Sequence, residues 1–521
     1  MYTWFVIIVS VCLAALIFRR RDGKKLPPGP SFLSSNFLLL TISVMQGLRP
    51  IITNLKSKYG PLITFSFGSR PLIFICSQDL AHEILIQKSS SVADRPSYSS
   101  LEESCTITKA SYGSTWRFLR RNLATEILQP SRVKSYSGAR KWALQILIGR
   151  LQQQQQQEEA AGVKVIDHFE HAMFSLFALM CFGMKLDEHR INEIISKSRD
   201  MLFAVHPGNL GVNILCTFPR LGKILLRKKW KDILQKREDQ EKVMLPLVKS
   251  RIEAVNNSEP QLGGNQMVAY VDTLMHLQLP EENANNGNGG KLTDKDLVSL
   301  CNEFLNAGTD TTISALQWIM ANLVKYPHIQ RKLYDEIVSV VGPPPPLPPP
   351  GVELKSFIRE EDLQNMSYLK AVVLEGLRRH SPAPFVLPHR AQEEAELRGF
   401  TIPRGATVNF TVADMGLDPK VWDDPVEFKP ERFLQVNNGV FDVTGRKGIK
   451  MMPFGVGKRM CPGYALGLLH LESFVANLIW YFHWTPPDGH DVDLTEKAEF
   501  TIVMMNPLQA KISSRTDKIT T

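Results

Sequence analysis

The residue best suited to take part in chemistry is Cys461, which lies in a glycine- and proline-rich segment at residues 453–463. An apolar run at residues 464–482 follows and predicts a helix. The N-terminal end of a helix favours a thiolate, and Pro462 suits the first helical turn because its missing N–H would have no partner there. Glycines allow the backbone to come close to a bound group. These features predict that Cys461 is a charged ligand, and an inert buried cysteine is the alternative.

A second candidate lies in a long predicted helix that begins after Thr293, which is placed to act as the N-cap. The run Ala307-Gly308-Thr309-Asp310-Thr311-Thr312 has poor helix propensity, and its glycine alone costs about 1 kcal/mol relative to alanine. The Thr311 hydroxyl can bond to the Ala307 carbonyl and bend the helix. The pattern indicates a functional bend, and a tolerated weak stretch is the alternative.

Trp116 and Arg120 lie four residues apart in a segment predicted to be helical, so their side chains face the same way. An indole N–H and a guanidinium that project together can bind a carboxylate, although a basic face exposed to solvent is the alternative.

Glu375 and Arg378 are three residues apart on another predicted helix. They could be a surface ion pair worth less than about 1 kcal/mol.

Together these motifs resemble those of the cytochrome P-450 superfamily. The pattern Phe454-x-x-Gly457-x-Arg459-x-Cys461-x-Gly463 resembles its haem-thiolate signature, and residues 307–312 resemble its oxygen-activation motif. Glu375-x-x-Arg378 and Pro430-Glu431-Arg432-Phe433 resemble two further elements. The resemblance covers essentially the whole chain after residues 1–18 and is strongest to the plant A-type endomembrane branch. It implies the cytochrome P-450 fold, mainly α with a small β lobe, as a single large catalytic domain behind an N-terminal transmembrane anchor.

The resemblance also implies a role for each site residue. Cys461 would be the proximal ligand of the iron in haem b, with Phe454 packed beside it, while Asp310 and Thr311 would relay protons. The haem propionates would be bound by Trp116, Arg120, His389 and Arg459. A buried structural network would be formed by Glu375, Arg378 and Arg432. The residues expected to line the substrate pocket are Ala307, Ala383, Phe385, Val386 and Ile502.

The implied reaction is a monooxygenation, in which one atom of dioxygen enters a hydrophobic small organic substrate and the other leaves as water. Electrons would come from NADPH through the flavins of a membrane-bound NADPH–cytochrome P-450 reductase, docking near Arg117, Arg121 and Lys458. Two alternatives stay open: a haem-thiolate isomerase or dehydratase, which needs no reductase, and a degenerate, non-catalytic membrane protein. Such isomerases usually lack the pair formed here by Asp310 and Thr311.

The charge and the cysteine content restrict the kinds of partner and of structural site that the chain is expected to have. The chain has 61 Lys+Arg and 52 Asp+Glu residues, a net charge of +9, with much of the excess in residues 19–25 and 220–231. No basic array is interleaved with stacking aromatic residues, so nucleic acid is not expected, and a membrane surface or an acidic protein fits better. The seven cysteines are widely spaced without a CxxC pair, which argues against a disulfide framework and a structural zinc site.

Residues 2–18 are almost wholly apolar, and Arg19, Arg20 and Arg21 follow directly. This charge asymmetry predicts an uncleaved transmembrane anchor over residues 1–18, with the body of the protein in the cytosol; a cleaved signal peptide is the alternative. Residues 19–30 would form a basic, proline-rich hinge, and residues 31–521 the catalytic domain. The hinge resembles that of endomembrane members of the family, which implies a single-pass protein of the endoplasmic reticulum membrane.

Several other segments carry structural expectations. Residues 61–77 predict a hairpin around Gly68-Ser69, and residues 398–411 predict a second one around Arg404-Gly405. The glutamine run 152–157 predicts an exposed extension without chemistry, and the proline-rich tract 341–351 predicts an extended surface connector. Residues 203–230 predict either a plain amphipathic face or a membrane-dipping segment. Relative to the family, residues 31–49 are unusual and the loop 97–110 is short.

Overall fold

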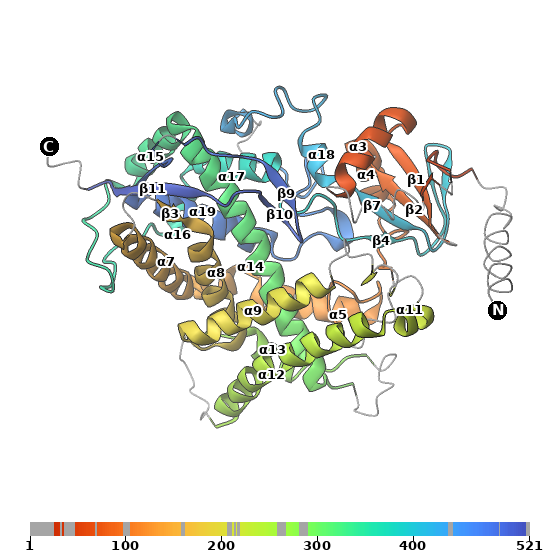
Figure 1. Ribbon diagram of the computed structural model, residues 1–521, viewed down its shortest axis with the longest axis horizontal. Helices are drawn as coiled ribbons and strands as arrows, with labels where there is room; N and C mark the ends of the chain where they lie inside the picture. Colours follow the sequence, from red (N-terminus) through yellow and green to blue (C-terminus); the bar gives the residue numbers. More distant parts are fainter. Residues whose placement is uncertain are drawn as a thin grey trace.

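The computed structural model describes residues 25–31, 34–35, 47–67, 70–96, 105–157, 162–205, 211–212, 215, 219–257, 267–280, 290–435, 441–488 and 490–516. The predicted anchor at residues 1–18 lies outside this part of the chain. So do residues 19–24 of the hinge, most of the unusual stretch 31–49, and residues 97–104 of the short loop. The described residues form a mainly helical molecule with a smaller β-rich part beside the N-terminal region (Figure 1).

The fold is built mostly from helices, and Figure 1 labels most of them. The α-helices are α3 (Leu48–Tyr59), α4 (Gln78–His82), α5 (Ser114–Asn122), α6 (Pro130–Ser135), α7 (Ser137–Gln157), α8 (Val165–Phe182), α9 (Glu188–Ala204), α11 (Pro219–Leu225), α12 (Arg227–Asn257), α13 (Tyr270–Met275), α14 (Asp294–Lys325), α15 (Pro327–Val341), α16 (Glu360–Leu363), α17 (Ser367–Arg379), α18 (Val412–Gly416) and α19 (Tyr464–Tyr481). Short π and 3-10 turns are η1 (Glu83–Gln87), η2 (Leu123–Ile127), η4 (Pro430–Phe433) and η5 (Gly457–Arg459).

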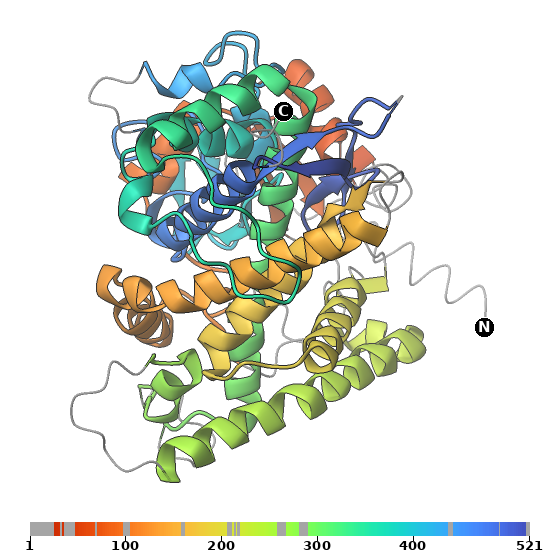
Figure 2. The ribbon, with the colours of Figure 1, turned by 90° about the vertical axis from the view of Figure 1, so that its left-hand side faces the viewer.

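Helix α14 runs through the middle of the molecule, with the other long helices packed around it (Figures 1 and 2). Thr293 is its N-cap, as predicted: the Thr293 hydroxyl accepts from the Asp296 N–H, and the Asp296 carboxylate accepts from the Thr293 N–H. From Thr312 to Val324 every residue is buried. The helix packs most extensively against α8 and also contacts α12, α17 and α19. It therefore connects the parts of the chain that carry the candidate site residues.

Helix α8 is apolar on all sides. Within the described part of the chain it is the one helix long and apolar enough to cross a membrane, but 89% of it is buried inside the protein. A helix that is apolar all round belongs either in a protein core or in a bilayer. Its burial against α14 and α7 shows that α8 is a core helix.

The strands form four small sheets. They are β1 (Leu62–Phe67), β2 (Arg70–Ile75), β3 (Val163–Lys164), β4 (His389–Arg390), β5 (Ala395–Leu397), β6 (Phe400–Ile402), β7 (Thr407–Phe410), β8 (Phe482–Thr485), β9 (Glu496–Ala498), β10 (Ile502–Met504) and β11 (Gln509–Ser514). The largest sheet has the order β1-β2-β7-β4. Its β1–β2 pair is antiparallel, from Leu62 opposite Ile75 to Phe67 opposite Arg70, which confirms the first predicted hairpin.

The second predicted hairpin is wrong. Strand β6 pairs with β5, whereas β7 crosses to another sheet and lies between β2 and β4. The tight turn joins β5 to β6 at Arg398 and Gly399, and not the strands on either side of Arg404-Gly405. Arg398 and Gly399 both have positive φ values, 48° and 74°. Two such residues in succession match the turn that best joins twisted antiparallel strands. The Arg404-Gly405 turn instead redirects the chain from one sheet to the next.

The glutamine run is also not an exposed extension without interactions. Helix α7 continues to Gln157, and its last turns bind three distant segments. Gln152 Nε2 donates to the Pro348 carbonyl at 3.1 Å, Gln155 donates to the Ile512 carbonyl, and Gln154 contacts His168 of α8. The polar side chains therefore fasten the proline-rich tract 341–351 and strand β11 to the helical core.

Candidate active site

Cys461 lies between η5 and α19, as the sequence predicts. Its N–H donates to the Phe454 carbonyl at 2.9 Å, which closes the loop that carries the sulfur. Gly457 has a φ of 77°, and a Cβ there would lie 2.2 Å from the Leu85 carbonyl oxygen, so only glycine fits. The loop is thus shaped by close backbone contact with η1.

The protonation of Cys461 departs from the simple expectation for a helix N-terminus. Burial raises the pKa of the Cys461 thiol, and the opposing effects of the Gly463 N–H and of Arg120 are smaller. The helix end alone does not make this sulfur a thiolate. A coordinated metal cation does, because a ligating thiol loses its proton outright.

In the candidate motif of α14, threonine hydroxyls form hydrogen bonds with carbonyls of the same helix. The hydroxyls of Thr311 and Thr312 donate to the carbonyls of Ala307 and Gly308 at 2.8 and 2.7 Å. Ala307 and Thr311 keep accessible surface, although the helix is otherwise buried from Thr312 onward. Gly308 serves a packing need that the sequence did not indicate, because a Cβ there would lie 2.1 Å from the Phe177 ring of α8.

Asp310 is surrounded by groups that change its acidity. Burial raises the pKa of Asp310 to about 6, and Arg199 of α9 opposes this rise. Arg199 Nη2 lies 2.6 Å from Oε1 of Glu170 on α8, and burial raises the pKa of Glu170 to about 7. A carboxyl group with a pKa near neutrality can hold and release a proton at physiological pH. Glu170 was not identified from the sequence, because it lies among the apolar residues of a core helix.

Three arginines converge near Cys461. Arg120 Nη2 donates to the Met460 carbonyl at 2.6 Å, and its charge acts on the Cys461 sulfur. Arg459 donates to the carbonyls of Ala93, Ile107 and Ala110, and its guanidinium lies 4.6 Å from the centre of the Trp116 ring. The structure thus brings three of the sequence-predicted residues together, namely Trp116, Arg120 and Arg459.

The third arginine, Arg95, was missed in the sequence. It donates to the carbonyls of Thr108, Leu387 and Pro388 at 2.7–3.0 Å, and burial together with the nearby charge of Arg459 lowers its pKa to about 9. Buried arginines are rare unless paired. Among the described residues, no carboxylate forms an ion pair with Arg95, Arg120 or Arg459. Only an arginine preceding a proline marked the position in the sequence, and its partners lie far along the chain.

His389 lies next to this cluster. Its Nδ1 donates to the Val92 carbonyl at 2.8 Å, and burial, with the charge of Arg95, lowers the pKa of His389 to about 3. The bond to a carbonyl fixes a proton on Nδ1. Nε2 would therefore carry a second proton only if an anion lay beside it.

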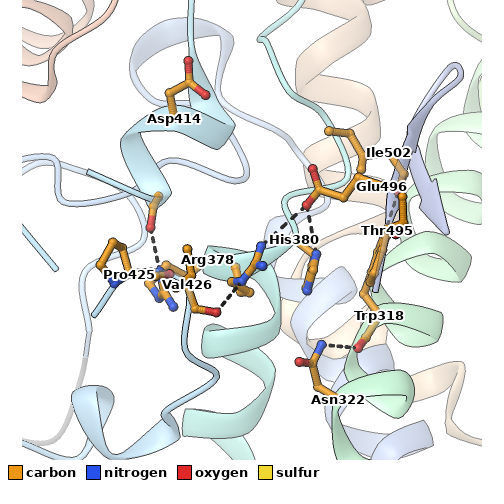
Figure 3. A network of polar contacts seen from close by, with 12 residues as sticks. Trp318, Asn322, Arg378, His380, Asp414, Pro425, Val426, Thr495, Glu496 and Ile502 are labelled. Atoms are coloured by element: carbon orange, nitrogen blue, oxygen red, sulfur yellow. Dashed lines mark hydrogen bonds and ion pairs between the residues drawn. The ribbon is translucent and has the colours of Figure 1, made fainter. Parts of the chain in front are cut away.

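The expected structural network is fully buried. Glu375 accepts two bonds of 2.7 Å from Arg378, and Arg432 Nε lies 3.4 Å from the same carboxylate. Arg378 also donates to the carbonyls of Gly416, Pro425 and Glu427. Figure 3 shows Arg378 beside Pro425. This is not the surface ion pair that was the alternative. The network ties α17 to the segment that leads to the Cys461 loop.

The expected pocket residues are placed less uniformly. Val386 approaches the Cys461 loop, since a Cβ at Gly455 would lie 3.7 Å from Val386 Cγ1. The Phe385 ring packs edge-on against Phe74, 5.7 Å away, and is thus engaged by the β-sheet part. The buried Ile502 is fixed through its backbone: its N–H donates to the Pro382 carbonyl, and its carbonyl accepts from Ser314 and Trp318 of α14. Ala383 follows Pro382 and is half-buried.

A cysteine ahead of a buried helix, a central helix whose threonine hydroxyls bond to its own carbonyls and a cluster of three arginines without carboxylate ion pairs in the described structure define a haem-thiolate class of protein. The sequence profile of the cytochrome P-450 family matches residues 27–513, and the chain belongs to this family. It is a haem-dependent monooxygenase.

Relatives cover nearly the full chain. The sequence is 45% identical to cytochrome P-450 89A9 of Arabidopsis thaliana, over 94% of each chain. It is 29% identical to isoflavone 2'-hydroxylase of Medicago truncatula, over 96% of this chain and 94% of the relative. It is 28% identical to beta-amyrin 24-hydroxylase of Glycine max, over 98% of this chain and 96% of the relative. The fold is similar to that of a zebra fish cytochrome P-450 solved with progesterone, with a TM-score of 0.71 at 21% identity, over 89% of this chain and 99% of that one.

The residues present fit haem b. The guanidiniums of Arg95, which is buried, and of Arg120 and Arg459, which are half-buried, form no ion pair with a carboxylate in the described structure. They suit two propionate groups, because bonds between arginine and carboxylate are the strong, charge-assisted kind. The buried Cys461 thiol, with a Gly463 N–H directed at it, suits an iron ligand whose electron density is tuned by a hydrogen bond. Both halves of the cofactor therefore find matching chemistry.

Proposed function

We propose that this chain is a membrane-bound monooxygenase that inserts one atom of dioxygen into a hydrophobic small organic substrate, using NADPH-derived electrons from a flavoprotein reductase. The observation that carries the proposal is the convergence of the Cys461 sulfur with the unpaired guanidiniums of Arg95, Arg120 and Arg459. The apolar character of the expected pocket residues supports a hydrophobic substrate.

In this proposal Cys461 binds the iron, and Phe454 packs against the start of α19 beside it, since a Cβ at Gly467 would lie 3.6 Å from its ring. Trp116, Arg95, Arg120 and Arg459 would hold the propionates, and His389 would join them when a neighbouring propionate stabilises a proton on its Nε2. The haem supplies the activation of dioxygen, and a thiolate ligand favours cleavage of the O–O bond. Glu375, Arg378 and Arg432 keep the loop in place and take no part in the chemistry.

Protons are handled by Asp310 and Thr311. With a pKa of about 6, Asp310 is partly protonated near neutral pH, so it both takes up and gives up a proton. The Thr311 hydroxyl donates to the Ala307 carbonyl, so its lone pairs remain able to accept a bond from another group. The two residues would thus provide a donor and a holder of protons in the same turn of α14.

The reductase would dock on the basic surface around Arg117, Arg121 and Lys458. Arg117 and Arg121 are exposed on α5, and the charges of Arg117 and Lys458 both lie about 5 Å from the Tyr112 ring. Clustered positive charge on one face attracts an acidic partner and speeds its association. The position of this surface directly outside the Cys461 loop supports short-range delivery of electrons.

Membrane attachment would use the anchor at residues 1–18 and the hinge at residues 19–30, with the catalytic domain 31–521 facing the cytosol from the endoplasmic reticulum membrane. The segment 203–230 supports a second contact. Phe203, Ile224 and Leu225 are 51, 74 and 67% exposed, with Lys223 and Arg227 close by in the chain. An apolar surface flanked by basic residues suits an interfacial position in a bilayer. This favours the membrane-dipping alternative for the segment.

The spectrum of the reduced protein with carbon monoxide tests the haem assignment. The wild type is expected to show the red-shifted band of a thiolate ligand, and Cys461→Ser is expected to lose it because an alcohol does not replace the thiolate. Cys105→Ser is the matched control, since Cys105 is half-buried and its side chain lies outside the expected ligand set. A wild-type spectrum without the band would contradict the assignment, and product formation without NADPH would favour an isomerase instead.

A further inference from the structure

The carboxylate of Glu496 is a junction between three elements that are far apart in the sequence. It accepts from Arg49 Nη1 of α3 at 2.8 Å and from His380 Nδ1 at 3.0 Å, and Arg379 Nη1 at the end of α17 lies 3.7 Å away. Figure 3 shows the Glu496 and His380 side chains facing each other. About a quarter of the Glu496 side chain is exposed, so most of the junction is shielded from water.

The other end of the same hairpin is fixed by Ile502. Strands β9 and β10 are antiparallel, with Glu496 opposite Met504 and Ala498 opposite Ile502. The Ile502 carbonyl accepts from Ser314 Oγ at 2.7 Å and from Trp318 Nε1 at 2.8 Å. Its N–H donates to the Pro382 carbonyl at 2.8 Å. The hairpin is therefore clamped between α14 and the chain that follows α17.

A pair of stacked rings connects Glu496 at one end of the hairpin to Ile502 at the other. The His380 and Trp318 rings lie parallel, 3.9 Å apart with an interplanar angle of 4°. Burial lowers the pKa of His380 to about 4, so the ring is neutral near pH 7 and donates its Nδ1 proton to Glu496. A shift of the Glu496 carboxylate would move His380, and the stack would pass this shift to Trp318, which holds Ile502.

Arg49 connects Glu496 to helix α3. Its Nε donates to Asp414 Oδ1 at 2.8 Å while its Nη1 holds Glu496, so one guanidinium bridges two carboxylates. Thr53, one turn further along α3, donates to the other oxygen of Asp414 at 3.1 Å. Because a guanidinium is planar and rigid, the bridge fixes an angle as well as a distance.

We propose that Glu496 and Arg49 are positioning residues that set the place of Ile502 and thereby the size of ligand that the pocket accepts. This rests on the proposed function in one respect, namely that Ile502 faces the substrate. The contact to α3 makes this helix part of the structure that sets ligand size. Neither residue is expected to touch the haem, so each is separable from cofactor binding.

The test compares a small and a large ligand of the haem iron in the full-length, haem-loaded protein. Imidazole and 4-phenylimidazole bind through the same nitrogen, but only the phenyl group of the second reaches the pocket wall. Arg49→Met and Glu496→Gln are expected to raise the Kd for 4-phenylimidazole by about fivefold, with the Kd for imidazole unchanged, measured by optical titration. Lys497→Gln is the matched control, because its 2.7 Å ion pair with Glu499 lies on the same hairpin and is solvent-exposed.

The outcomes separate the two levels of the proposal. Ile502→Ala must change the binding of 4-phenylimidazole. If it does not, Ile502 is not in the pocket and the inference falls, while a normal carbon monoxide spectrum leaves the proposed function standing. If Ile502→Ala acts but Arg49→Met has no effect, the positioning role is contradicted. Should Glu496→Gln lose haem, Arg49→Met decides, because it leaves Glu496 bound to His380 and near Arg379.

Discussion

Thr311 and Thr312 are adjacent residues that make the same hydrogen bond in different surroundings. Both hydroxyls donate to the carbonyl four residues earlier, at 2.8 and 2.7 Å. Thr312 is buried, whereas Thr311 keeps accessible surface beside Ala307. A hydroxyl can take part in proton transfer only where a reacting group can reach it. The neighbour in the chain therefore offers an internal comparison for the role of Thr311.

Thr311→Ala is expected to lower the product formed per NADPH consumed by about threefold or more, because a proton donor is lost. Thr312→Ala is expected to keep this ratio and to lose only about 1 kcal/mol of stability with its hydrogen bond. The measurement is product against NADPH consumption, with a substrate found by screening for shifts of the haem absorption band. Equal coupling in wild type and Thr311→Ala would remove the hydroxyl from the proton pathway.

At the residue level, the site could be predicted from the sequence where its chemistry is local. Cys461 with its glycines and Thr311 with its helical neighbours form short patterns that the chain displays directly. Arg95 and Glu170 were missed for a physical reason. Arg95 is defined by carbonyls from Leu387 and Pro388, and Glu170 by Arg199 on another helix. Only folding brings such partners together.

At the level of elements, the contact between α14 and α8 depends on one missing side chain. Gly308 lets the Phe177 ring lie against the backbone of α14, where a Cβ would be 2.1 Å from the ring. This explains why a glycine that costs helix stability stands in the central helix. The position of residues 307–312 relative to the core is thus set by an aromatic ring on the neighbouring helix.

Gly308→Ala is expected to lower the free energy of unfolding by about 1–3 kcal/mol, because overpacking outweighs the gain in helix propensity. Gly149→Ala in α7 is the control, since its Cβ would meet no atom within 4 Å. That substitution is expected to stabilise the protein by about 0.5–1 kcal/mol. Urea unfolding followed by circular dichroism measures both. A stabilising Gly308→Ala would contradict the packing role.

Elements were predicted best where their limits are written in neighbouring residues. The Thr293 capping box, the helix after Cys461 and the hairpin at residues 62–75 follow from local rules. The partner of β7 could not be predicted in this way, since β2 lies more than 300 residues upstream. A turn fixes only the strands beside it, and sheet order depends on which distant strand offers a free edge.

At the scale of the whole molecule, its two exposed features face different partners. The basic surface around Arg117 and Lys458 lies outside the Cys461 loop, where the proposed reductase would dock. The apolar residues of α9 and α11 lie in another part of the chain, at Phe203, Ile224 and Leu225.

In a chain lacking residues 1–24, Ile224→Asp with Leu225→Asp is expected to weaken binding to anionic phospholipid vesicles by more than about tenfold, because two apolar side chains no longer enter the interface. Val426→Asp is the control, since Val426 is 66% exposed in a different segment. Vesicle flotation measures the bound fraction. Equal flotation of the double variant and the truncated parent would exclude a second membrane contact.

The glutamines at the end of α7 have a consequence for inheritance. Repeated codons tend to gain or lose copies, and many glutamine tracts vary in length without harm because they are unstructured. Here Gln152, Gln154 and Gln155 each meet a different distant partner. One added glutamine would turn every later side chain by about 100° around the helix axis. We therefore expect natural length variants of this tract to be selected against, unlike those of a disordered repeat.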